Sequence, residues 1–280
     1  MPIAPSLIGG SLSGWTFLQA TLPRQEETFA KSPDIERTAE TLRTKLSEPL
    51  TLDGLMGDRQ LLGGVLQSLG LEAEIDKGAF LRKIIEDGPD DPQGFARRLN
   101  SPEFIALSDT FQPDSDGFIR LSASKVEEIE RDFKRNAFEV SVGEQEPDLR
   151  LALNFQDTAS ELANSASSDT SFWLRVIGTA PISEVFNTAF LLPDGFGSLD
   201  IDQQVDVLES RAKQFLGDNP VETLKTEEGV ESVIRRFLLQ RQLESGPDPF
   251  SAASAALTIL SGTGSFGTQS LTSLVLSNAV

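Results

Sequence analysis

The sequence contains no cysteine, no histidine and no tyrosine. Without cysteine and histidine, the chain cannot form a disulfide or a Cys/His zinc site, and it has no thiolate nucleophile. The side chain that most often acts as a general base near neutral pH is also missing. Trp15 and Trp173 are the two tryptophans, so aromatic surfaces for stacking sugars or nucleobases are scarce. The composition therefore indicates no catalytic residue, no metal ligand and no cofactor site.

Long apolar runs and an early positive charge are missing as well. No run approaches the roughly 18 apolar residues that a bilayer-spanning helix needs. No Lys or Arg precedes Arg24, whereas a cleavable signal peptide begins with a positively charged region. We therefore expect no transmembrane segment and no cleavable signal peptide. The absence of cysteine is typical of a cytoplasmic protein, and it also fits an exported protein without disulfides.

The charge that is present is strongly negative. The chain has 24 Lys and Arg against 43 Asp and Glu, which gives a formal net charge of −19. Such a surface repels phosphate backbones, so we expect no nucleic acid partner. All charged side chains lie between Arg24 and Asp248. The chain thus divides into an uncharged N-terminal segment, residues 1–23, a charged body, and an uncharged C-terminal segment, residues 249–280, which is either flexible or docked on the body.

The body has the pattern of a helical protein. Pro33, Pro92 and Pro102 each follow a Ser or Asp, which is typical of the first position of a helix after its N-cap. Ser124 and Glu127 have the spacing of a capping box. Apolar residues then recur at helical spacing in three further stretches, which are 126–133, 205–215 and 230–238.

The best strand-like fragment, residues 138–143, stands alone, so we predict an all-α fold. The body also has a faint internal similarity with a period near 125 residues, for example between residues 62–71 and 186–192. One interpretation is a duplication into two helical halves, residues 24–143 and 144–248. The other is that any two helical hairpins share such cap and apolar patterns.

Both uncharged ends carry apolar residues that are candidates for partner binding. Those in the N-terminal segment follow one helical stripe, and those in the C-terminal segment follow a glycine-rich break. The candidates are Ile8, Leu12, Trp15, Leu18, Leu22, Leu271 and Leu274. The alternative is that these ends dock on the body or remain disordered.

Two sequence motifs suggest ligand binding, but neither has the flanking residues that such a site requires. Residues 262–267 match the glycine pattern of a dinucleotide-binding loop, but no acidic residue follows them. Asp114 and Asp116 resemble half of a calcium loop, but Ala123 stands where the closing Glu is required. We expect a turn that precedes a helix beginning near Ser122. Weak binding of a divalent cation by the two Asp residues stays open.

Several blocks of the body resemble one protein family. They include Leu55–Leu62, Leu69–Glu72, Ala79–Asp87 and Leu151–Phe155. In sequence and order they are similar to DUF1217, a bacterial family of unknown function that is associated with flagellar gene clusters. Leu69 and Asn154 stand at positions where an aromatic residue is usual. The resemblance implies an all-helical fold and a flagellum-associated role, and it supplies no catalytic residue.

These observations predict a non-enzymatic, flagellum-associated structural or assembly protein that acts through protein–protein contacts. It would be flagellum-associated or cytoplasmic, with a flagellar protein as partner. The first alternative is a cytoplasmic binding module, chaperone or regulator of a flagellar component. A more remote alternative is a carboxylate-dependent hydrolase, which requires a buried Glu with a raised pKa in a pocket. The identity of the partner and the oligomeric state are left open by the sequence.

Overall fold

The computed structural model describes residues 4–7, 11–88, 94–99, 101–193 and 195–245. Within these ranges the chain forms fourteen α-helices, two short 3₁₀ helices and one pair of two-residue strands. The all-α prediction is therefore confirmed. Within the same ranges, no helix combines the length and the apolarity that crossing a membrane requires.

The first helix, α1 (Ser11–Ala30), precedes the elements of the first half. These elements are α2 (Pro33–Leu46), β1 (Leu50–Thr51), α3 (Leu52–Gly57), α4 (Arg59–Ser68), η1 (Glu72–Glu74), α5 (Gly78–Asp87), α6 (Phe95–Leu99), α7 (Pro102–Phe111), β2 (Phe118–Ile119) and α8 (Ala123–Gly143). Strands β1 and β2 pair antiparallel, with Leu50 opposite Ile119.

The regular secondary structure of the second half is entirely helical within its described residues. Its elements are α9 (Pro147–Ser165), α10 (Asp169–Gly178), α11 (Ala180–Ala189), η2 (Phe196–Ser198), α12 (Ile201–Leu216), α13 (Pro220–Thr223) and α14 (Glu227–Ser245). The boundary predicted at residues 143 and 144 falls in the short connection between α8 and α9.

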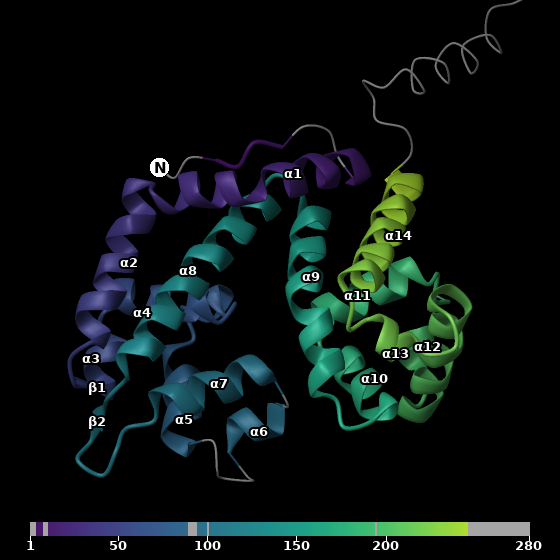
Figure 1. Cartoon of the computed structure of the whole chain (residues 1–280). Helices are drawn as coiled ribbons and strands as arrows, with labels where there is room; N and C mark the ends of the chain where they lie inside the picture. The colour runs from purple at the N-terminus through teal and green to yellow at the C-terminus, as the bar shows by residue number, and fades with distance from the viewer. Residues whose placement is uncertain (1–3, 8–10, 89–93, 100, 194, 246–280) are drawn as a thin grey trace, which may run out of the picture.

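Each half is organised around three helices that pack on one another. In the first half these are α2, α4 and α8, and in the second they are α9, α11 and α14. Helices α8 and α9 also pack together, which joins the halves, and α1 lies across both of them (Figure 1). The buried apolar side chains form one cluster that includes residues of both halves. The two halves therefore share a single hydrophobic core.

Helix α1 corrects the predicted boundary at residue 23, because the helix continues through Pro23 to Ala30. A lack of charge is not a signal that ends a helix, so the composition change does not mark a structural boundary. The buried face of α1 includes Trp15 and Leu18, which are 1% and 0% exposed. The Trp15 indole N–H donates a hydrogen bond to Glu231 Oε2 of α14 over 3.0 Å. Helix α1 is thus an integral part of the fold that fastens the two halves together.

The predicted helix starts are partly confirmed. Helix α2 begins at Pro33 and α7 begins at Pro102, as the proline pattern indicates. Pro92 lies outside the described residues. The capping box at Ser124 is wrong, because the N-cap of α8 is Ser122, whose hydroxyl accepts a hydrogen bond from the Lys125 N–H at 3.2 Å. Two serines lie at the start of this helix, and the first of them has the extended backbone that an N-cap requires.

Helices α4 and α11 end in the same kind of turn. After α4, the N–H of Leu71 bonds to the Leu66 carbonyl and that of Gly70 bonds to the Gln67 carbonyl. After α11, the N–H groups of Leu192 and Leu191 make the equivalent two bonds. This pair of bonds requires one residue with a left-handed backbone, and φ is +71° at Gly70 and +52° at Leu191. The shared turn is what a duplication would produce, but duplication itself stays a hypothesis.

We expect Gly70→Ala to destabilise the protein by about 1–2 kcal/mol, because a Cβ is disfavoured at this left-handed backbone. A Cβ at Gly70 would meet no atom within 4 Å, so the cost is conformational alone. Gly57→Ala is the matched control, since it has the same free space at the end of α3 without a left-handed backbone. Urea unfolding of both variants tests this, and equal midpoints would contradict it.

Candidate functional site

A cleft of about 980 Å³ lies where the two halves face each other. The first half contributes the end of α4, including Leu69, the start of α7, including Pro102, and Glu139 of α8. The second half contributes Arg150 of α9 and Arg241 of α14. The cleft therefore combines charged groups with the apolar edges of several helix ends.

Ion pairs cross this cleft and connect its walls. Arg150 of α9 donates to Glu72 of η1 at 2.6 Å, which links the two halves directly. Within the second half, Arg241 pairs with Asp148 at 3.2 Å and also with Glu184. Burial raises the pKa of Asp148, and the neighbouring Arg241 opposes that rise. Most charged groups on the walls of the cleft named here are therefore paired within the fold.

Glu139 is the most unusual residue of the cleft, because its side chain is ionisable and the residue is only 7% exposed. Arg135 lies one turn earlier on α8, with its Nε 3.8 Å from Glu139 Oε1. The same guanidinium is 3.3 Å from Asp157 of α9, so Arg135 contacts the carboxyl groups of both Glu139 and Asp157. Burial, and then repulsion by Asp157, raises the pKa of Glu139 to about 7. Glu26 of α1 adds a third carboxylate, whose pKa is also raised by burial.

This cluster meets one requirement of the hydrolase alternative, which is a buried Glu with a raised pKa in a cleft. The remaining geometry gives that alternative no support. Glycoside hydrolases hold their two carboxyl groups about 5–9.5 Å apart, so that substrate or water fits between them. Glu139 and Asp157 instead share Arg135 as an ion-pair partner, and Asp157 lines a different cavity, of about 1010 Å³ between α1, α9 and α14. The cluster is better suited to joining three helices than to attacking a substrate.

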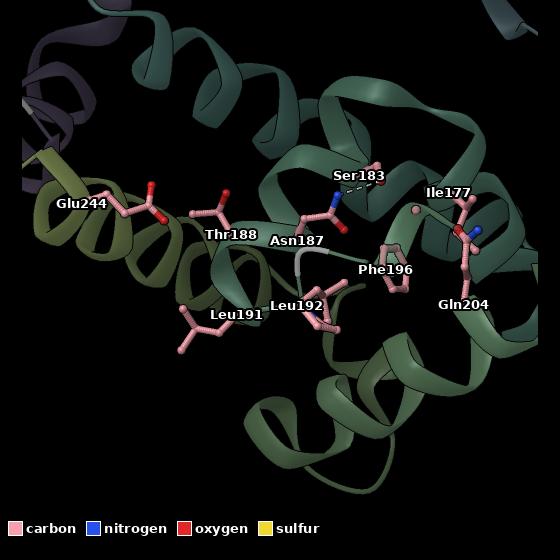
Figure 2. A pocket seen from close by; sticks show the side chains of 11 residues that line it. Ile177, Ser183, Asn187, Thr188, Leu191, Leu192, Phe196, Gln204 and Glu244 are labelled. Carbon is pink, nitrogen blue, oxygen red and sulfur yellow. Dashed lines mark hydrogen bonds between the residues drawn. The ribbon is translucent and has the colours of Figure 1, made fainter. Parts of the chain in front are cut away.

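A further cavity of about 760 Å³ lies in the second half, between α10, α11, η2 and the ends of α12 and α14. Figure 2 shows Asn187 at its centre, with Ile177 and Phe196 on one side and Leu191 on the other. The Asn187 amide donates to Ser183 Oγ at 3.4 Å. Its Oδ1 is buried and has no hydrogen-bond partner among the described residues. The cavity thus contains an acceptor that is available to an added hydrogen-bond donor.

Four of the predicted partner-binding residues lie in the described part of the chain, all on α1, and none of them is fully exposed. Trp15 and Leu18 are buried against the body, so their side chains are not exposed to a partner in this conformation, and their role in partner binding stays a prediction. Leu12 and Leu22 are half-buried on the same helix. The remaining three candidates, Ile8, Leu271 and Leu274, lie outside the described residues, as does the glycine-rich motif at 262–267. For the described N-terminal residues, docking on the body is the alternative that holds.

The two Asp residues of the half calcium loop form the expected turn. Asp114 Oδ1 accepts hydrogen bonds from the N–H groups of Asp116 and Phe118, at 2.9 and 3.0 Å. Arg120 pairs with Asp114 and supplies the positive charge there. Among the described residues, no group of three or more acidic side chains is arranged to hold a metal ion.

Sequence reasoning did not single out Glu139 or Asn187. Residues 138–143 alternate in polarity, which made them the best strand-like fragment of the sequence. In the structure these residues belong to α8, and the helix turns Phe138, Glu139 and Val142 inward together. The signal that could have identified Glu139 is its position between Phe138 and Val142, because charged residues are rarely found within an inward-facing apolar stretch.

Comparisons with known proteins show the fold and a family of unknown function. The profile of the family described as "Protein of unknown function (DUF1217)" matches residues 68–230, which is more than half of the chain. Among solved structures, the chain is similar to the crystal structure of protein AGR_C_984 from Agrobacterium tumefaciens. The TM-score is 0.66 and the identity is 24%, over 86% of this chain and 100% of that chain. A search among curated proteins gives no match.

Proposed function

This chain belongs to the DUF1217 family of proteins of unknown function, and from that premise we propose that it is a non-enzymatic structural or assembly protein of the bacterial flagellum. The flagellar part of the proposal comes from the resemblance described above, which associates the family with flagellar gene clusters. The protein would act through contacts with a flagellar partner protein.

The observation that supports a protein-binding role is the cleft between the two halves. It is lined by helix ends and loops of both halves, and Leu99, which is 46% exposed, lies on its wall. Apolar side chains beside paired charges are characteristic of surfaces that bind proteins. The paired state of Glu139, Arg150 and Arg241 also disfavours a catalytic use of the cleft, since each of these groups has a partner within the fold.

The experiment is deletion of the gene in a bacterium that encodes this chain, followed by complementation and purification of its flagella. A structural protein is expected to restore swimming and to copurify with the hook, the filament or the basal body. A chaperone or regulator, the alternative, would restore swimming and be absent from purified flagella. Unchanged swimming and unchanged flagellar assembly in the deletion strain would overturn both forms of the proposal.

A substitution in the cleft tests whether the proposed function depends on the cleft. We expect Leu99→Glu to reduce swimming strongly, because it places a charge on the apolar wall that would contact the partner. Its melting temperature should stay close to that of the wild type, because substitutions at exposed positions change stability by about 0.5 kcal/mol or less. Leu174→Glu is the matched control, since Leu174 is 42% exposed on α10 and does not line the cleft. Equal swimming by the two variants would contradict a role for the cleft.

A further inference from the structure

The cavity around Asn187 differs from the other cavities in its charge. Eleven residues line it, and Glu244 at its edge is the single charged one among them. By contrast, seven of the nine residues lining a cavity between α1 and α8 are charged. In a protein whose residues are 24% charged, this cavity is a patch of mostly uncharged surface.

The walls of this cavity also carry apolar side chains and hydrogen-bonding groups. Leu191 is 50% exposed on its rim, and the side chains of Ser183, Thr188 and Gln204 line it beside apolar groups. The buried Asn187 Oδ1 has no hydrogen-bond partner among the described residues. A buried acceptor without a partner is unfavourable by about 1–3 kcal/mol in general, so a segment that supplied a donor there would be stabilised. The surface therefore fits an uncharged chain that carries both apolar and hydroxyl side chains.

The chain itself contains such a segment, and the segment follows closely in sequence after a residue that lines the cavity. Glu244 lines the cavity, and the described part of the chain ends at the next residue, Ser245. Residues 249–280 carry no charged side chain. Within them, Ala253, Ala256, Leu257 and Leu260 have the spacing of one helical face, and Ser254 and Thr258 offer hydroxyl donors.

We propose that residues 252–260 of this chain dock in the cavity between α10, α11 and η2, with Leu257 and Leu260 against Leu191 and Leu192. This inference is independent of the flagellar role, and it identifies the occupant of a surface that the described residues leave open. A second copy of the chain or a different protein would compete for the same surface.

The connection between the cavity and this segment is long enough. Six residues, 246–251, separate Ser245 from Ala252, and six extended residues span about 20 Å. A short flexible tether keeps its end at an effective concentration in the millimolar range, so even weak contacts are occupied when they are intramolecular. Matching an uncharged segment to an uncharged cavity also avoids removing a charged group from water.

The absence of cysteine makes a direct test possible in the full-length chain. Thr188→Cys places a thiol on the cavity wall, and Ala256→Cys places a second thiol in the segment. Under mild oxidation we expect this double variant to form an intramolecular disulfide at least ten times faster than the matched pair Ser47→Cys and Ala256→Cys. Ser47 is exposed in the first half and does not line the cavity. Electrophoresis separates the cross-linked monomer from any dimer.

Each result bears on the proposal. Equal rates for the two pairs would overturn it, and cross-linked dimers in place of monomers would assign the cavity to a second copy. Hydrogen exchange of the cysteine-free protein gives a second measurement that does not depend on the new thiols. Leu260→Asp is expected to speed exchange at residues 187–192, whereas Ser270→Asp, ten residues further along, leaves it unchanged. The same exchange rate in all three proteins would likewise overturn the proposal.

Discussion

The variant Leu18→Asp is expected to lose about 4 kcal/mol or more of stability. Leu18 is 0% exposed on α1, where this helix packs on α8, α9 and α14. The substitution removes a buried apolar side chain and leaves a carboxylate without water or a positive partner in the core. For a chain of this size, such a loss corresponds to a decrease in melting temperature of roughly 10 °C. Thermal unfolding followed by circular dichroism measures it.

Ala20→Asp is the control for this prediction, because Ala20 is exposed on the same helix and the introduced charge is the same. Its melting temperature should stay near that of the wild type. A partner-binding role for Leu18 predicts the opposite pattern, with unchanged melting and lost association. If Leu18→Asp melted like Ala20→Asp, the packing of α1 against both halves would be wrong.

The variant Glu139→Gln is expected to be more stable than the wild type at pH 8, by about 3 kcal/mol. The pKa of Glu139 is about 7 in the folded chain, against an ordinary value of 4.5 for glutamate in the unfolded chain. Between these two values the folded state holds a proton that the unfolded state has released. Stability therefore falls as pH rises from about 4.5 to 7, and then levels off. A pKa shift of this size corresponds to about 3 kcal/mol of lost stability. Gln removes this loss because its side chain is uncharged at every pH.

Urea unfolding of both proteins between pH 4.5 and pH 8.5 tests this prediction. The two curves should nearly coincide at the acid end and separate as pH rises. Glu127→Gln, an exposed position on the same helix, is the control and should follow the wild type at every pH. If Glu139→Gln were less stable than the wild type at pH 8, the ion pair between Glu139 and Arg135 would outweigh the burial of the charge.

Much of the local structure could be predicted because it depends on neighbouring residues. Prolines after Ser32 and Ser101 marked the starts of α2 and α7, since proline fits the first turn of a helix. The spacing of Val126, Ile129 and Phe133 identified the buried face of α8, and all three are at most 4% exposed. These features need only helical periodicity, which a single sequence displays.

The errors arose where a local pattern admitted two solutions. Ser122 and Ser124 both suit an N-cap, and only the backbone decides between them. Residues 138–143 alternate like a strand, yet they continue α8 because that helix packs on α4 and α9 along this length. Packing supplies the energy that overrides a weak local preference in a short fragment.

The sequence by itself determined that this protein is helical and acidic, and that it has no cysteine or histidine chemistry. Composition and periodicity are properties of the chain, so they need no knowledge of distant contacts. Only the tertiary structure decided that Trp15 and Leu18 lie in the core, and that Glu139 meets Asp157 beside Arg135. These residues are far apart or on different helices, and their meeting depends on how the two halves pack. Among the described residues, the same packing leaves the cavity around Asn187 open beside the end of α14.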